Sequence, residues 1–176
     1  MMTCSKTYSE IPFAHRQHRH QGHCSLIHGH NWTLKLTFAC EVFDENGFVV
    51  DFGNLKYIKD WLAEHLDHAC VLATNDPLLD RIVNSVPEVY KVHTVSNASC
   101  EGISVHLWEE LSLLVHKHEN GRVWIAQLEM LEDSKNSTCF TPTAQAVARM
   151  RGCATHALQS SQLDHIRGGV AEEALV

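Results

Sequence analysis

Residues 13–32 read Phe13-Ala-His15-Arg-Gln-His-Arg-His-Gln-Gly-His-Cys24-Ser-Leu-Ile-His28-Gly29-His30-Asn-Trp32, and six of the fourteen histidines of the chain lie in this segment. After Trp32, polar and apolar residues alternate as Thr-Leu-Lys-Leu-Thr-Phe, which predicts a β-strand. Residues two positions apart on a strand point to the same face, so His28 and His30 are expected to lie side by side. Gly29 then points to the other face and leaves room beside the backbone.

Two imidazoles on one strand face can bind a single metal ion, because neutral imidazole is the commonest metal ligand in proteins. His15 could supply a third ligand from the segment before. Three histidines with an open fourth position are typical of a catalytic zinc site rather than a structural one. The alternative is a solvated loop or an adventitious metal trap, and we favour this alternative for His18, His20 and His23.

Length, charge and cysteine usage argue against several classes of protein. A chain of 176 residues with 44% hydrophobic residues can form one domain with a substantial core. Its net charge of −7 argues against a surface for nucleic acid or for anionic membranes. No apolar run reaches transmembrane length, and the first residues lack the apolar region of a signal peptide. Seven cysteines without a C-x-x-C motif fit a cytoplasmic protein better than a disulfide scaffold.

Periodicity along the rest of the chain predicts an α+β fold, in which an antiparallel sheet carries two helices on one face. Strands are expected over 3–14, 30–42, 48–52, 89–95 and 122–130. Helices are expected over 54–67 and 99–120, with a short helix near 78–83. Asn46-Gly47 predicts the tight turn of a hairpin before the strand over 48–52. Because both long helices cover one face, we expect oligomerisation to cover the other.

The apolar periodicity that predicts strands and helices ends at about residue 140. Alanine, glutamine, serine, glycine and arginine dominate there, and no long apolar period survives. Residues 1–140 are therefore expected to form the domain. Residues 141–176 are expected to form a poorly ordered tail, with a frayed helix over 144–158.

Five residues outside the histidine triplet could carry chemistry. Cys24 precedes His28 by four positions, and a thiol near a dication ionises more easily, so it could move protons or act as a fourth zinc ligand. The adjacent pair Asp67-His68 could orient a histidine tautomer, or could simply end a helix. Glu129 lies in an otherwise apolar strand, where it either faces outward or pairs with N–H donors of a ligand ring. Glu101 lies in the first turn of a helix, where the helix dipole alone could explain it.

Several metal and nucleotide motifs are missing. The absence of H-E-x-x-H argues against a zincin protease. A 2-His-1-carboxylate iron site requires a carboxylate close to the histidine pair, yet the next acidic residue after His30 is Glu41. The chain also contains no G-x-G-x-x-G and no Walker motif.

Together these residues resemble the 6-pyruvoyltetrahydropterin synthase / 6-carboxytetrahydropterin synthase family, over roughly residues 5–135. The resemblance rests on a series of short motifs in the order of the family. These are Phe13-Ala-His15, Cys24-x-x-x-His28-Gly29-His30, Val50-Asp51-Phe52-x-x-Leu55-Lys56, Leu66-Asp67-His68, Cys100-Glu101 and Glu129. The H-G-H element with its upstream cysteine and downstream L-D-H is the specific part of this combination.

The resemblance implies the tunnelling fold, in which four-stranded antiparallel sheets of several subunits join into a barrel, usually as a hexamer. It also implies active sites that form between subunits. Zinc would be bound by His15, His28 and His30. Proton transfer would fall to Cys24, Asp67 and His68, the pterin ring would be anchored by Glu129, and Glu101 would lie near the site.

Three residues between the cysteine and H-G-H resemble the bacterial 6-carboxytetrahydropterin synthases, whereas the pyruvoyl enzymes typically have five. The implied reaction converts 7,8-dihydroneopterin triphosphate to 6-carboxytetrahydropterin, acetaldehyde and triphosphate in queuosine biosynthesis. The alternatives are the pyruvoyl reaction on the same substrate, or a non-catalytic protein that binds zinc or pterin. Three stretches depart from the family pattern. Val71-Leu72 replaces the usual Leu-Asn after D-H, and Ala98-Ser99-Cys100 replaces the usual Pro-Thr before the glutamate of the helix. Met130 follows Glu129, where a threonine is usual.

Overall fold

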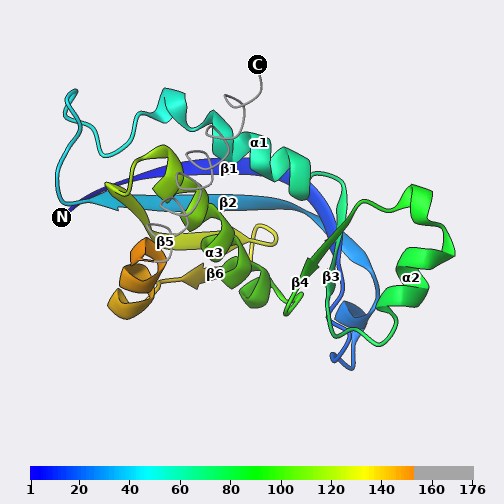
Figure 1. Cartoon of the computed structure of the whole chain (residues 1–176). Helices are drawn as coiled ribbons and strands as arrows, with labels where there is room; N and C mark the ends of the chain where they lie inside the picture. Colours follow the sequence, from blue (N-terminus) through cyan, green and yellow to red (C-terminus); the bar gives the residue numbers. More distant parts are fainter. Residues whose placement is uncertain (153–176) are drawn as a thin grey trace, which may run out of the picture.

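The computed structural model of the protein describes residues 1–152, and its framework is a six-stranded mixed sheet of order β4-β3-β1-β2-β5-β6 (Figure 1). The tail was predicted over 141–176, and its part over 153–176 lies outside the described residues. The strands are β1 (Met2–His15), β2 (His28–Cys40), β3 (Ala69–Ala73), β4 (Val92–Val95), β5 (Val123–Leu131) and β6 (Ser137–Phe140).

The helices are α1 (Lys56–His65), α2 (Leu79–Ser85) and α3 (Cys100–His118), and residues 144–152 are also helical. Single 3-10 turns occur at His23–Ser25, Phe52–Asn54 and Pro87–Val89. As predicted, Ser99 caps α3, because its hydroxyl accepts a hydrogen bond from the backbone N–H of Gly102. The helix ends before Gly121, whose φ of 73° is the left-handed conformation that glycine adopts easily.

The hydrophobic core lies between the sheet and the two long helices, which cover one face as predicted. Alternate residues of β2 point toward the helices because side chains along a strand alternate between faces. The central core residues come from β2 (Leu34, Leu36, Phe38), α1 (Ile58, Leu62) and α3 (Ile103, Leu107, Leu111), and all are at most 3% exposed. In the part of the chain that the structure describes, no helix has the length and apolar character needed to cross a membrane.

The α+β class is confirmed, and β1, β2, β5 and β6 form the expected four-stranded antiparallel sheet. Two parallel strands extend it, because β3 pairs with β1 and β4 pairs with β3. The strand β4 falls within the predicted strand over 89–95, whereas the sequence did not indicate β3. All five residues of β3 are buried, so its sequence shows no alternation that would distinguish a strand from a buried helix segment.

The strand predicted over 48–52 is wrong. The predicted turn does form, since the backbone N–H of Asp44 donates to the carbonyl of Phe48 and the N–H of Gly47 donates back to Asp44. The chain then continues into the 3-10 turn Phe52–Asn54 instead of returning along β2. Both edges of β2 are already paired, with β1 on one side and β5 on the other, so no edge is left for a hairpin partner.

Candidate metal centre

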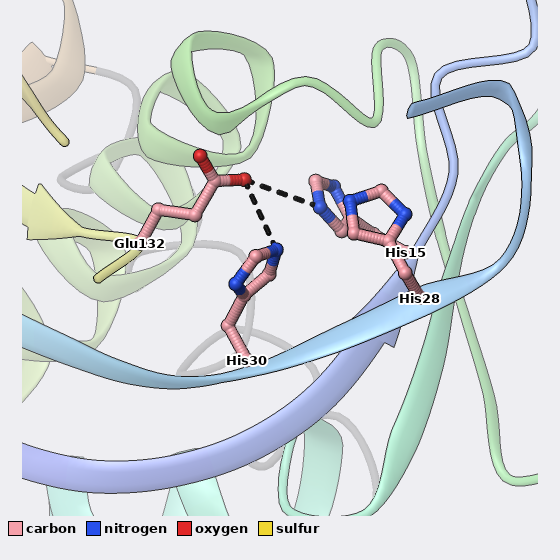
Figure 2. Close-up of side chains that lie close together, drawn as sticks. All are labelled: His15, His28, His30 and Glu132. Carbon is pink, nitrogen blue, oxygen red and sulfur yellow. Dashed lines mark ion pairs between the residues drawn. The ribbon is translucent and has the colours of Figure 1, made fainter. Parts of the chain in front are cut away.

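Three histidines converge where the end of β1 pairs with the start of β2. In this antiparallel register His15 lies opposite His28, and Phe13 lies opposite His30. The ring centroids of His15 and His28 are 4.5 Å apart, those of His28 and His30 are 5.1 Å apart, and those of His15 and His30 are 5.6 Å apart. The predicted convergence of the three imidazoles is therefore present in the structure (Figure 2).

Backbone carbonyls select the tautomer of two of these rings. The Nδ1 of His15 lies 2.8 Å from the carbonyl oxygen of Ala98, and the Nδ1 of His28 lies 2.8 Å from that of Leu26. A carbonyl can only accept, so each Nδ1 carries the proton and each Nε2 keeps a free lone pair. Such outer partners orient histidine ligands in metal sites. Burial lowers the pKa of His15, which keeps the ring neutral and able to bind a cation.

The indole of Trp32 forms a wall of the site. It is fully buried, stacks on Phe13 with centroids 4.7 Å apart, and donates a hydrogen bond from Nε1 to the Phe13 carbonyl at 3.1 Å. Its ring meets those of His15 and His30 edge-on at 5.0 and 5.1 Å. The two histidines thus stand against a rigid aromatic surface, which limits their rotamers.

A close backbone approach positions the carbonyl that holds His15. A Cβ on Gly102 would lie 2.3 Å from the carbonyl oxygen of Asn97, so only glycine fits there without movement of the backbone. This contact keeps the turn before α3 tight against the first turn of the helix. The same turn carries Ala98, whose carbonyl accepts the hydrogen bond from His15.

A fourth side chain, Glu132, lies at the histidines, and no sequence motif predicted it there. Its Oε1 is 3.3 Å from the Nε2 of His15 and 3.4 Å from the Nε2 of His30 (Figure 2). One ligand atom from each of these residues and from His28 can be chosen so that all four lie within 4.8 Å of one another. The expectation that no carboxylate could reach the pair was wrong, because β5 brings Glu132 from a distant part of the chain.

The buried nitrogens of this cluster fit a metal ion. The Nε2 atoms of His15 and His30 are both buried and have no hydrogen-bond partner. Unpaired buried polar atoms are costly, and a bound cation would satisfy both lone pairs at once. Three imidazoles and one carboxylate are a donor set suited to a divalent transition metal.

Comparison with known proteins points to the same chemistry. The model of the family described as 6-pyruvoyl tetrahydropterin synthase matches residues 3–143. The chain belongs to this family. It is 33% identical over 141 residues to the 6-carboxy-5,6,7,8-tetrahydropterin synthase of Rickettsia bellii, an alignment that covers 80% of this chain and 98% of that protein. The synthase of the same name from Rickettsia conorii is 30% identical over 63% of this chain and 80% of its own length.

Solved structures show the same fold. An uncharacterized protein of Wolinella succinogenes superposes with a TM-score of 0.68 at 19% identity, over 81% of this chain and 98% of that one. The 6-pyruvoyl tetrahydropterin synthase of Caenorhabditis elegans superposes with a TM-score of 0.57 at 20% identity, over 81% of this chain and 96% of that one. The tunnelling-fold class expected from the family resemblance is therefore confirmed.

The other residues implied by the family resemblance do not gather at the histidines within one chain. Asp67 and His68 do meet, with Nδ1 of His68 2.6 Å from Oδ1 of Asp67, and the imidazole is 81% exposed. Cys24 is exposed in the loop between β1 and β2. Among residues 1–152, no hydrogen bond joins this thiol to either member of the pair. Glu101 is exposed in the first turn of α3.

Two of these residues belong to the face of the sheet that no helix covers. An open hollow of about 460 Å³ is lined by His68 and by residues that alternate with the metal-site histidines, such as Gly29 and Asn31, and His30 of the cluster also lines it. On the same face, Glu129 lies opposite Lys35, and Oε2 of Glu129 is 3.9 Å from Nζ of Lys35. The buried side chain of its neighbour Met130 points to the other face, so the departure from threonine alters core packing rather than the surroundings of Glu129.

The loop that carries Cys24 is anchored at several points. The guanidinium of Arg16 lies 3.1 Å from the buried carboxylate of Asp76, and the amide of Gln17 donates to Asn97 at 2.7 Å. The backbone N–H of Gln17 also donates to the carbonyl of Cys24 at 2.7 Å. These contacts hold the loop near the turn that supports His15 and fix the backbone at Cys24.

Proposed function

We propose that the protein is a metal-dependent carbon–carbon lyase that acts on 7,8-dihydroneopterin triphosphate. With one water, the reaction yields 6-carboxy-5,6,7,8-tetrahydropterin, acetaldehyde and triphosphate, a step of queuosine and other 7-deazaguanine biosynthesis. The observation that carries the proposal is the convergence of three imidazoles, of which His15 is buried and the other two half-buried, with ligand atoms close enough to share one ion. The name of the Rickettsia bellii relative, which aligns over nearly its whole length, supports the choice of substrate.

We propose Zn²⁺ as the metal, bound by His15, His28 and His30. Zinc bound by three histidines acts as a Lewis acid that polarises substrate oxygens. The hydrogen bonds from Nδ1 of His15 and His28 to backbone carbonyls preset the tautomers that such a site needs. The buried wall formed by Trp32 excludes water from one side of the cluster.

Proton transfer is assigned to Cys24 together with Asp67 and His68. The carboxylate of Asp67 accepts the Nδ1–H of His68, which leaves Nε2 able to take a proton from a thiol. A thiolate formed in this way is the reactive form of Cys24. The carboxylate of Glu129 would anchor the pterin by accepting hydrogen bonds from the N–H groups of the ring. These charge-assisted hydrogen bonds would replace the weak contact of Glu129 with Lys35.

The separation of these groups within one chain favours an oligomeric active site. His68 and Glu129 lie on the uncovered face of the sheet, and of the histidine cluster only His30 also lines the hollow that contains His68. A neighbouring subunit can bring its own Asp67 and His68 to Cys24, so we propose a homohexamer. We place the enzyme in the cytoplasm, where a chain with seven cysteines and no C-x-x-C motif keeps its thiols reduced.

Incubation with dihydroneopterin triphosphate and identification of the products by mass spectrometry test the proposal. Release of acetaldehyde with 6-carboxytetrahydropterin supports it. A pyruvoyl product without acetaldehyde assigns the protein to the pyruvoyl activity, for which the Caenorhabditis elegans neighbour is named. Bound metal without any turnover indicates a non-catalytic homologue. Cys24→Ala is the matched variant, because it should keep the metal and lose turnover.

A further inference from the structure

We propose that a small polar pocket beside the metal cluster binds the triphosphate of the substrate, with Arg19 as its charged anchor. The pocket, which we call the loop pocket, has a volume of about 190 Å³. It is lined by residues 17–19, Ala73, Asn75, Ser96 and Asn97. This assignment rests on the proposed function for the identity of the substrate, whereas the affinity of the pocket for a phosphate chain does not depend on the reaction.

The loop pocket lies next to the metal cluster along the chain. The Nδ1 of His15 donates to the carbonyl of Ala98 at 2.8 Å. Two residues after His15, the side-chain amide of Gln17 donates to Oδ1 of Asn97 at 2.7 Å. An extended chain advances by about 3.3–3.6 Å per residue, so at most about 7 Å of chain separates the two contacts. A triphosphate on the side chain whose oxygens the metal binds can therefore reach the pocket.

The same pocket lies where two parallel strands end. β3 ends at Ala73 and β4 ends at Val95, and Asn75 and Ser96 follow within two residues. Ligand sites in sheets of parallel strands commonly lie outside the carboxyl ends of the strands. Within the described residues, no hydrogen bond engages the side chain of Asn75 or Ser96. An amide and a hydroxyl are thus available to oxygens of a ligand.

The charge of the loop pocket suits an anion. Arg19 is exposed, and its guanidinium forms no ion pair in the part of the chain that the structure describes. No carboxylate lines the pocket, since the adjoining carboxylate of Asp76 is buried and paired with Arg16 at 3.1 Å. By contrast, the turn after β5 carries two carboxylates, Glu132 and Asp133, and would repel a phosphate chain. The triphosphate is therefore drawn toward Arg19.

Asn97 supplies a second donor whose direction is fixed. Its Oδ1 accepts hydrogen bonds from the amide of Gln17 at 2.7 Å and from the backbone N–H of Ser99 at 3.1 Å. Its Nδ2 is left as a donor without a partner among residues 1–152. The backbone is held as well, because the Asn97 carbonyl packs so closely on Gly102 that a Cβ there would lie 2.3 Å away. A preset donor loses little freedom when it binds a phosphate oxygen, which favours affinity.

The first experiment uses inorganic tripolyphosphate, which has the anionic chain without the pterin. Calorimetric titration of the full-length protein, dialysed free of metal so that the probe cannot bind to zinc, gives its Kd. We expect Arg19→Gln to raise this Kd about 10-fold, because one charged donor is lost. Asn97→Asp keeps an acceptor for Gln17 but replaces the free donor by a negative charge, so it should weaken binding at least as much. Lys135→Gln is the matched control, since it removes one positive charge outside the pocket and should leave the Kd within about twofold.

Three results of this titration would overturn the assignment. The first is that tripolyphosphate does not bind to the wild type. The second is an equal Kd in the wild type and in Arg19→Gln, with circular dichroism showing that the variant is folded. The third is an equal loss in Lys135→Gln, because the effect would then be general electrostatics rather than a pocket.

The second experiment tests whether the loop pocket serves the proposed active site. In the zinc-loaded Cys24→Ala protein, which should not turn over, calorimetry compares 7,8-dihydroneopterin triphosphate with 7,8-dihydroneopterin. Adding Arg19→Gln should weaken the triphosphate about 10-fold and leave the compound without phosphates within about twofold. Equal weakening of both ligands would show that Arg19 supports the loop and not the phosphates, and would overturn the assignment.

Failure of the proposed function gives a different result. If the Cys24→Ala protein binds neither pterin, the proposed function is refuted, and with it the role of the loop pocket in that reaction. Binding of tripolyphosphate that requires Arg19 would then remain as a property of the pocket alone. If both pterins bind and Arg19→Gln changes neither affinity, the proposed function stands and only the triphosphate assignment falls.

Discussion

Two groups of histidines in this molecule look alike in composition and differ in what they can do. The metal cluster consists of His15, His28 and His30. The second cluster combines His65 at the end of α1, His93 on β4 and His106 on α3, with ring centroids of His93 and His106 5.0 Å apart and those of His65 and His93 5.9 Å apart. Only the metal cluster has ligand atoms that converge on one point among the described residues.

The difference lies in which nitrogen atoms are already occupied. In the second cluster, Nε2 of His93 lies 2.9 Å from Nε2 of His106, so one ring donates to the other and both nitrogens are used. In the metal cluster the hydrogen bonds to Ala98 and Leu26 use Nδ1 and leave Nε2 free. A metal site therefore differs from a packed histidine pair in the hydrogen-bond partners of its ring nitrogens, and not in the number of its histidines.

The largest expected effect comes from removing one ligand of the metal cluster. His28→Ala should weaken zinc binding by well over the roughly 100-fold that loss of a supporting partner costs, and it should abolish turnover. His106→Ala is the matched change in the second cluster, and it should keep one tightly bound metal per chain. Metal content after dialysis against a chelator, measured by plasma mass spectrometry, separates the two variants. Loss of metal from His106→Ala would break the comparison, since the second cluster would then also bind or support an ion.

The tryptophans that pack against the two clusters should differ in how much they contribute to stability. Trp32 is fully buried and hydrogen-bonded, so Trp32→Ala should cost about 3–5 kcal/mol in the free energy of unfolding. Trp61 packs on His65 at 4.5 Å but is only half-buried, so Trp61→Ala should cost clearly less. Urea unfolding of the two variants with a chelator present tests this order. Equal losses would show that the metal cluster is no more tightly packed than the second cluster.

The same comparison shows how far the sequence could lead. The side-by-side placement of His28 and His30 follows from alternation within one strand, and the positions of α1 and α3 follow from apolar periodicity and from the cap at Ser99. Both signals are local, and the structure confirms both. Cys24, Asp67 and His68 were named from short motifs, and their joint role stays a prediction because it requires a second chain.

Features that depend on strand register could not be found in this way. Glu132 reaches the histidines because β5 pairs with β2, with Leu131 opposite Thr33, and nothing in either segment alone fixes that register. The strand β3 was missed because its five residues are all buried and show no alternation. The strand predicted over 48–52 failed for the converse reason, since its turn signal is real but β2 has no free edge.

A smaller effect should appear in the pH dependence of stability. The pKa of His93 falls to about 4, first because of burial and then because His106, His65 and Lys91 disfavour a further positive charge. The unfolded chain, with a histidine pKa near 6.5, binds more protons than the folded one between about pH 6.5 and 4. Stability should therefore fall as the pH falls through this window, by less than about 1.4 kcal/mol per pH unit because the ring is half-exposed.

His93→Gln removes this titration, and urea unfolding at pH 7, 6 and 5 can detect the loss. A chelator in every sample keeps the metal cluster from contributing, and His15 titrates equally in both proteins. The difference in unfolding free energy between wild type and variant should shrink as the pH falls. A constant difference would show that His93 takes up its proton equally in the folded and unfolded protein, so that its pKa is not lowered by folding.

The smallest effect is expected in the loop, where histidines are most concentrated and least organised. His20 is exposed, and its Nδ1 accepts a hydrogen bond from the backbone N–H of Gly22 at 2.9 Å, which is a local turn contact. His20→Ala should leave both the zinc Kd and the stoichiometry of one tight ion per chain unchanged within about twofold, since the residue supplies no converging lone pair. Isothermal titration with Zn²⁺ measures both quantities. If several weak ions bind to the wild type and their number falls in His20→Ala, the loop itself binds metal and the separation between organised and merely abundant histidines no longer holds.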